Sequence, residues 1–196
     1  MLNDIRICFI GDSFVNGTGD PEQLGWVSRL CALSQTDEIE LTHYNLGVRG
    51  ETSEDIKLRW ESECNRRLPD HSDNRLVFSF GVNDTTFENG QLRVSTQKSI
   101  QNTNDILVKA AEKYKVIMIG PPPVDEQAQN ERIKNLDAAF QSLSATLKLP
   151  YLSVFNALQN TPVWLKEVSA NDGAHPKSAG YSALARLVKA WDHWAL

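Results

Sequence analysis

The sequence has few cysteines, and none of them stands in a pairing or metal-binding pattern. Cys8, Cys31 and Cys64 are odd in number, widely separated and without the CxxC spacing of zinc and redox motifs. A disulfide framework and a zinc centre are therefore both disfavoured. A chain without disulfides suits a reducing compartment, so we expect a cytoplasmic protein.

Long hydrophobic runs are absent from the sequence as well. The first residues, MLNDIRICFIGDS, contain an acid at position 4 and an apolar run of only about five residues. Such a run is too short for the core of a signal peptide or for a membrane span. We therefore expect neither secretion nor insertion into a membrane.

The sequence also lacks an excess of positive charge. It has 20 Lys and Arg against 25 Asp and Glu, a formal net charge of -5, and its basic residues are scattered. Nucleic acids and anionic lipid surfaces are therefore poor candidate partners, and a small molecule is the expected one. With 41% hydrophobic and 23% charged residues, the 196 residues suit one globular domain spanning 1–196. Nothing in the sequence indicates an oligomeric state.

What the sequence does contain is an alternation of strand-like and helix-like segments. Five apolar, β-rich runs alternate with five segments of helical periodicity, which predicts a parallel sheet with helices on both faces. For five such units the flavodoxin-like strand order 2-1-3-4-5 is favoured, giving a three-layer α/β/α fold. The expected strands are 5–11, 39–47, 75–81, 115–121 and 150–155, and the expected helices are 22–35, 53–68, 95–114, 126–148 and 177–194.

Ligands bind open sheets of this kind beyond the carboxyl ends of the strands, so functional residues are expected in the loops that follow the strands. The first, GDSFVNGTGD, carries Ser13 two residues past the predicted strand, between Gly11 and Gly17. A sharp turn there would expose the serine hydroxyl. A serine in a glycine-rich loop is more often a turn residue than a nucleophile, and only a nearby base would change that interpretation.

The candidate base is His175, in the NDGAHP segment before the last predicted helix. Asp172 precedes it by three residues, a spacing that lets the carboxylate hold one ring nitrogen while the other takes the serine proton. Taken alone, the pair is more often a turn or capping residue and a surface histidine than a catalytic pair. The other histidines, His43, His71 and His193, lie outside the loops of the binding edge.

Acyl transfer also needs hydrogen-bond donors for an oxyanion, and the two neighbouring loops offer them. The loop after the second strand carries Gly50, whose backbone N–H can approach a substrate closely. The loop after the third strand carries Asn83, whose side-chain amide is a donor. Each residue alone is an ordinary turn residue. Together with Ser13 and His175, they are expected at one edge of the predicted sheet.

These blocks resemble those of the SGNH hydrolases, the GDSL esterase and lipase superfamily. GDSF, NLGVRGETS, GVND and DGAHP match its four blocks in order and across nearly the whole chain. The resemblance implies Ser13 as nucleophile, His175 as general base and then acid, and Asp172 as the residue that orients the imidazole. It also implies an acyl-enzyme mechanism on carboxylic esters, without a metal or organic cofactor.

The same resemblance implies an oxyanion hole made of the Ser13 and Gly50 backbone N–H groups and the Asn83 side chain. Gly47 blurs the match to the second block, but alignment on GETS favours Gly50. Phe14 replaces the leucine of the short GDSL motif, a departure expected to alter packing rather than chemistry.

The substrate is less well defined than the reaction. Without a long insertion to form a lid, an open cleft for small, soluble short-chain acyl or aryl esters is expected, while deacetylation of carbohydrates and cleavage of thioesters stay open as alternatives. Five residues in the edge loops are candidates for lining the pocket or for packing within the loops: Phe87, Pro122, Val124, Trp164 and Val168.

Two hypotheses of other classes remain at this stage. A flavodoxin-like module could bind a phosphate or mononucleotide at the GDS loop, although GTGDPEQLG lacks the spacing of known phosphate-binding motifs. A partner-binding protein could also have kept the fold without the activity.

Overall fold

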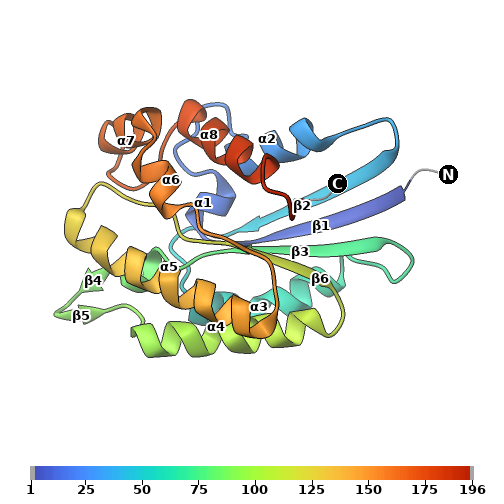
Figure 1. Ribbon diagram of the computed structural model, residues 1–196, viewed down its shortest axis with the longest axis horizontal. Helices are drawn as coiled ribbons and strands as arrows, with labels where there is room; N and C mark the ends of the chain where they lie inside the picture. Colours follow the sequence, from blue (N-terminus) through green and yellow to red (C-terminus); the bar gives the residue numbers. More distant parts are fainter. Residues whose placement is uncertain (1–2, 195–196) are drawn as a thin grey trace.

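A five-stranded parallel sheet forms the centre of the molecule (Figure 1). The structure is a computed structural model, and it describes residues 3–194. The strands lie in the order β2-β1-β3-β6-β7, which confirms the predicted order 2-1-3-4-5. Their bounds are β1 (Asn3–Gly11), β2 (Ile39–Gly47), β3 (Asp73–Ser79), β6 (Lys115–Ile119) and β7 (Tyr151–Leu152).

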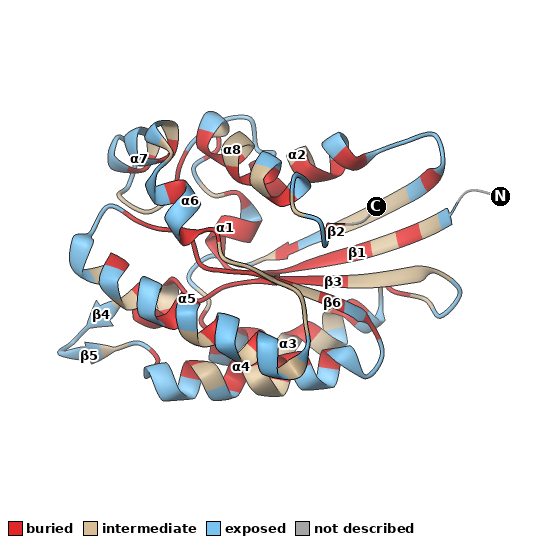
Figure 2. Ribbon diagram, viewed as in Figure 1, coloured by how far each residue is buried: buried red, intermediate tan, exposed pale blue. Residues whose placement is uncertain are grey.

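Helices cover both faces of the sheet and create two separate hydrophobic cores. Along β1, alternate side chains point to opposite faces, so Ile7 and Phe9 join one core while Cys8 and Ile10 join the other. Figure 2 shows the carboxyl-terminal halves of β1 and β3 buried between the two helical layers. The helices on the first face are α2 (Gly25–Ser34), α6 (Phe155–Gln159), α7 (Pro162–Ser169) and α8 (Ser178–Lys189), and those on the second are α3 (Ser53–Asn65), α4 (Thr96–Ala111) and α5 (Gln127–Leu147).

Two of the predicted strands are shorter in the structure than in the sequence analysis. The strand predicted at 115–121 ends at Ile119, because Pro121 and the prolines after it lack the N–H that a sheet ladder needs. The strand predicted at 150–155 is the two-residue β7, which pairs with Met118 and Ile119 at the end of β6. β7 therefore stops where its neighbour β6 stops.

The last helix is also shorter than predicted. The pattern favoured helix over 177–194, but α8 ends at Lys189. The chain then turns so that Trp194 packs its ring 6.1 Å from that of Phe9 and donates its indole N–H to Ser34 Oγ at 2.9 Å. Trp194 is therefore buried beyond the end of the helix.

A small hairpin beside the binding edge was not predicted. It consists of β4 (Phe87–Glu88) and β5 (Gln91–Leu92), paired antiparallel after the short 3-10 helix η1 (Asn83–Thr85). Asn89 and Gly90 form its turn, both with positive φ. Asn-Gly is a common hairpin signal, so the sequence did contain an indication of this element.

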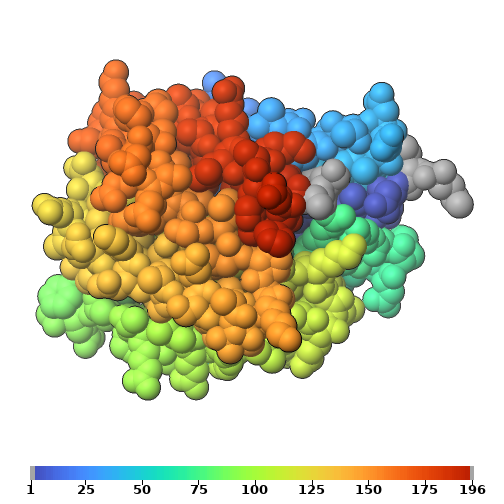
Figure 3. All heavy atoms as spheres, in the orientation of Figure 1, coloured from blue at the N-terminus to red at the C-terminus, as the bar shows by residue number. Residues whose placement is uncertain are grey.

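The surface in Figure 3 shows α6, α7 and α8 packed side by side, in orange and red. The loop that carries His175 connects α7 to α8, so this packing helps to fix its position. None of the helices in residues 3–194 is both long enough and apolar enough to span a bilayer.

Candidate active site

Ser13 begins a tight helical turn, α1 (Ser13–Asn16), directly after β1. The Asp12 carboxylate accepts the Phe14 N–H at 2.9 Å and so caps this turn, while Gly17 ends it with φ of +84°. Gly11 must be glycine, because a Cβ there would lie 1.9 Å from the Ser79 carbonyl oxygen. Close packing of β1 against β3 therefore sets where the serine emerges.

His175 lies within hydrogen-bond distance of both Asp172 and Ser13. One oxygen of Asp172 accepts the backbone N–H groups of Ala174 at 3.0 Å and His175 at 2.8 Å, which folds the loop into a turn. The other oxygen lies 2.7 Å from His175 Nδ1, and His175 Nε2 lies 2.7 Å from Ser13 Oγ. A neutral imidazole that donates from Nδ1 to the carboxylate can accept the serine proton at Nε2.

The environment of Asp172 keeps this carboxylate ionised. Partial burial alone would raise its pKa, but the His175 amide, the His175 ring and the Ala174 amide all donate to it and lower the pKa below the ordinary value. A negative charge beside Nδ1 stabilises the positive imidazolium that forms when His175 takes a proton.

Aromatic rings support the imidazole from the side of the core. The Phe14 ring lies 4.9 Å from the His175 ring and stacks on Trp164 at 6.4 Å, measured between ring centres. Trp164 in turn donates its indole N–H to the Pro123 carbonyl at 3.0 Å. Phe14, which departs from the GDSL leucine, thus fills the space behind the imidazole.

The two loops expected to supply oxyanion donors are connected to each other. The Asn83 side-chain amide donates one hydrogen to the Glu51 carbonyl at 2.8 Å, which leaves its second hydrogen available. Gly50, next to Glu51, has φ of +78°, and a Cβ there would meet no atom within 4 Å. Gly50 therefore lies in an open turn beside Asn83.

Gly47, the competing glycine of the second block, has a different role. A Cβ at this position would lie 2.1 Å from the Asn16 backbone nitrogen. Gly47 therefore permits the end of β2 to pack against α1. The two glycines are distinguished by their surroundings, since Gly47 is enclosed and Gly50 is open.

A cavity of about 360 Å³ lies over Ser13, His175, Asp172 and Asn83. It is bounded by the loops after β1, β3, β6 and α7, and many of the residues that line it have polar side chains. Four of the polar lining residues were not recognised from the sequence: Thr86, Asp125, Glu126 and Gln129.

Of the five residues that the sequence offered for the pocket, Val124 is among the lining residues. Trp164 and Val168 belong to the hydrophobic core, because α7 packs its apolar face inward. Pro122 is buried without lining the cavity, and Phe87 is 58% exposed on the hairpin. Of the two roles considered for each residue, packing therefore applies to Trp164, Val168 and Pro122, and Phe87 has neither.

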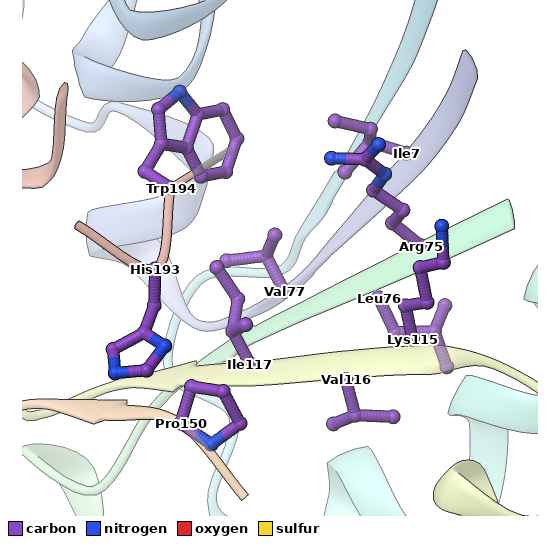
Figure 4. A pocket seen from close by; sticks show the side chains of 10 residues that line it. All are labelled: Ile7, Arg75, Leu76, Val77, Lys115, Val116, Ile117, Pro150, His193 and Trp194. Atoms are coloured by element: carbon purple, nitrogen blue, oxygen red, sulfur yellow. The ribbon is translucent and has the colours of Figure 1, made fainter. Parts of the chain in front are cut away.

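A second cavity of about 370 Å³ lies at the opposite, amino-terminal end of the strands (Figure 4). Its floor is apolar, with Ile7, Val77 and Ile117 from three adjacent strands, and Trp194 and His193 border it. The described residues that line it include no serine and no carboxylate. Within residues 3–194, no three His, Cys, Asp or Glu side chains gather as a metal site.

The order of the four blocks and the Ser13, His175 and Asp172 contacts agree with a match at the level of the family. The profile of the GDSL-like lipase/acylhydrolase family matches residues 9–183. The chain belongs to this family. It is accordingly a hydrolase of ester bonds, as the SGNH resemblance of its sequence predicted. No curated protein matches the chain in sequence.

Three solved structures share the fold of this chain over nearly the whole length of each protein. A lipase/acylhydrolase from Enterococcus faecalis is 24% identical, with a TM-score of 0.74, over 94% of this chain and 93% of that one. A lipolytic protein of the G-D-S-L family from Veillonella parvula DSM 2008 is 18% identical, with a TM-score of 0.79, over 98% and 100%. An acetylxylan esterase from Geobacillus stearothermophilus is 19% identical, with a TM-score of 0.75, over 93% and 91%.

Proposed function

We propose that this GDSL-family hydrolase cleaves small carboxylic esters, with short-chain acyl or aryl groups, through a Ser13 acyl-enzyme. The observation that carries the proposal is the continuous contact from Asp172 through His175 to Ser13, with both hydrogen-bond distances at 2.7 Å. The contact ends at a cavity large enough for a small ester.

In the proposed reaction, His175 Nε2 takes the Ser13 proton as Oγ attacks the carbonyl carbon of the ester. The oxyanion is stabilised by the backbone N–H groups of Ser13 and Gly50 and by the second amide hydrogen of Asn83. Collapse of the intermediate expels the alcohol, which takes the proton from His175. Water then repeats the sequence on the acyl-enzyme and releases the acid. Losing one oxyanion donor would raise the barrier by roughly 3 kcal/mol.

The acetylxylan esterase from G. stearothermophilus offers independent support for these roles. Its catalytic mutants replace a serine near the start of the chain, an aspartate and a histidine. The aspartate and histidine are three positions apart, as Asp172 and His175 are.

A second candidate substrate class is acetylated carbohydrate. The polar walls of the cavity favour it, because Thr86, Gln129 and Glu126 supply both donors and acceptors that could bind sugar hydroxyls. An activated aryl ester tests the chemistry of the site alone, whereas an acetylated sugar also tests these walls.

The test is a panel of acyl esters, thioesters and acetylated sugars, measured on the wild type and on Ser13→Ala. We expect hydrolysis of a short-chain ester by the wild type and none by the variant, and a fluorophosphonate probe should label only the wild type. Ser62→Ala, which removes an exposed hydroxyl on α3, serves as control and should keep full activity.

Two results would reject the proposal. Wild-type rates in Ser13→Ala would remove the serine from the chemistry. A wild type that resists labelling and carries a tightly bound nucleotide would instead support the flavodoxin-like binding module.

A further inference from the structure

We infer that Arg59, on α3, is a positioning residue that holds the Ser13 loop and the Gly50 loop in register for oxyanion binding. The inference rests on the proposed function and extends it to a residue outside the cavity. Arg59 lies outside the four sequence blocks, and it is not among the residues that line the cavity over Ser13.

The contacts of Arg59 reach the ends of two adjacent strands. Its Nη2 donates to the Gly11 carbonyl at 3.1 Å and to the Leu46 carbonyl at 2.9 Å. Gly11 is the last residue of β1 and stands two positions before Ser13, and Leu46 is the penultimate residue of β2. One nitrogen therefore bridges the two strands where they lead into the catalytic loops.

A second arm of the same guanidinium reaches the Gly50 loop. Arg59 Nε donates to a carboxylate oxygen of Glu51 at 2.6 Å, and Glu51 directly follows Gly50. The Glu51 backbone carbonyl is also the acceptor of the Asn83 amide. Movement of Glu51 would consequently disturb both Gly50 and Asn83, whereas movement of Gly11 would disturb Ser13.

The shape of the guanidinium is essential to this arrangement. Its nitrogens donate in fixed, diverging directions, with Nη1 bonded to Glu63 on the same helix at 3.1 Å. The side chains of Arg59 and Glu51 are only 16% and 18% exposed, so water competes little for these contacts. A lysine would keep the charge but would concentrate its donors on a single atom. It could not serve both strand ends and Glu51 together.

The test compares Arg59→Lys with the wild type. We expect kcat on an activated ester to fall between about 10-fold and 100-fold while KM changes less than about twofold, since donors are misplaced for the transition state and not for substrate binding. The inhibition constant of an aryl boronic acid, whose tetrahedral adduct with Ser13 resembles the transition state, should rise by the same factor as kcat/KM falls.

Arg67→Lys is the matched control. Arg67 follows the same helix and donates to the Glu63 carbonyl at 2.6 Å, and its guanidinium lies 5.9 Å from the centre of the Tyr44 ring. Neither of these contacts involves the catalytic loops, so this variant should keep the wild-type kcat and boronate affinity. A variant with weaker effect, Glu51→Gln, keeps a neutral acceptor for Arg59 and should show a smaller loss confined to kcat.

Hydrogen exchange separates this inference from the proposed esterase function. In Arg59→Lys, amides in segments 11–18 and 47–52 should exchange faster than in the wild type, and those of α8 should not change. This outcome is expected even if the wild type hydrolysed no ester. Wild-type exchange in both segments, or equal loss of kcat in Arg59→Lys and Arg67→Lys, would overturn the role of Arg59.

Discussion

At the scale of single residues, two carboxylates near Ser13 have opposite environments. Asp172 is hydrogen-bonded on both oxygens, and its pKa is lowered. Asp12 is buried, and one of its oxygens has no hydrogen-bond partner within residues 3–194. Its burial, reinforced by the nearby charge of Asp84, raises its pKa to about 7 despite the donated Phe14 amide.

Asp172→Asn should reduce kcat/KM for an activated ester by a factor on the order of 10³ to 10⁴. An amide can donate to Nδ1 and so favours the tautomer in which Nε2 carries the proton and cannot accept one from Ser13. Steady-state kinetics at neutral pH measures the loss. The exposed Asp192→Asn is the control and should retain wild-type kinetics, and an Asp172→Asn enzyme of comparable rate would contradict the assigned role.

Asp12 makes a prediction about stability rather than rate. Because its folded pKa is raised, its contribution is most favourable below the unfolded pKa of 3.8 and is lost as pH rises toward about 7. Asp12→Asn removes the titrating carboxyl group. The free energy of unfolding of the variant, measured relative to that of the wild type, should therefore increase by up to about 4 kcal/mol between pH 4 and pH 8. Denaturant unfolding of both proteins at several pH values measures the difference. A constant difference across this range would show that Asp12 does not titrate as described.

At the scale of elements, the loop after β3 is anchored by buried polar contacts. Asp84, at the η1 turn, accepts the Ser53 backbone N–H at 2.8 Å and the Ser99 hydroxyl at 2.6 Å. It thereby joins three elements, since Ser53 begins α3 and Ser99 lies in α4. Burial raises the pKa of Asp84, although both serines oppose the shift.

Asp84→Asn should destabilise the fold by roughly 1–3 kcal/mol, because one of the two buried donors loses its acceptor. Asp105→Asn, which breaks a half-exposed ion pair with Lys57, should cost at most about 1 kcal/mol. Both values come from urea unfolding at neutral pH. Equal costs for the two variants would deny Asp84 its anchoring function.

The structure also shows which elements a sequence pattern could reveal. The strand order followed from five apolar runs separated by amphipathic helices, since right-handed crossovers leave few topologies. Ser13, Asn83, Asp172 and His175 could be placed at one edge because each follows a strand or precedes a helix in a recognisable block. Gln129 could not be placed there from the sequence, because a polar residue in a predicted helix is expected on the face of the helix exposed to solvent.

Tertiary packing alone makes Gln129 part of the site. Its side-chain amide donates to the Val82 carbonyl at 3.1 Å and to the hydroxyls of Thr85 and Thr86 at 3.3 and 3.2 Å. Through these contacts α5 holds the loop that carries Asn83. Such contacts depend on where two distant segments meet, which local periodicity does not specify.

At the scale of the whole molecule, the two cores enclose all three cysteines. Cys8 and Cys64 lie in the core under α3, and Cys31 lies in the core under α2. Burial raises the pKa of Cys31 to about 12. For Cys64, contact with Cys8 and burial both raise the pKa. Thiols that are enclosed and protonated react slowly.

The native protein should therefore resist a thiol-specific disulfide reagent at pH 8, whereas the protein unfolded in guanidinium should release three equivalents of chromophore. Because the three thiols are divided between both cores, their protection reports the integrity of both layers. Rapid reaction of one thiol in the native protein would reveal local opening on the face that contains it.

The contact between His175 and Ser13 has a consequence for how the site forms as each molecule folds. The two residues are 162 positions apart, and the segment after His175 returns to the first loop through Ser178 on Asp20 and Tyr181 on the Thr18 carbonyl. In the proposed mechanism Ser13 has no base until the segment that carries His175 has docked against the first loop. Activity under this proposal therefore requires two segments from distant parts of the sequence to have met, so a chain in which α8 has not docked should be inactive.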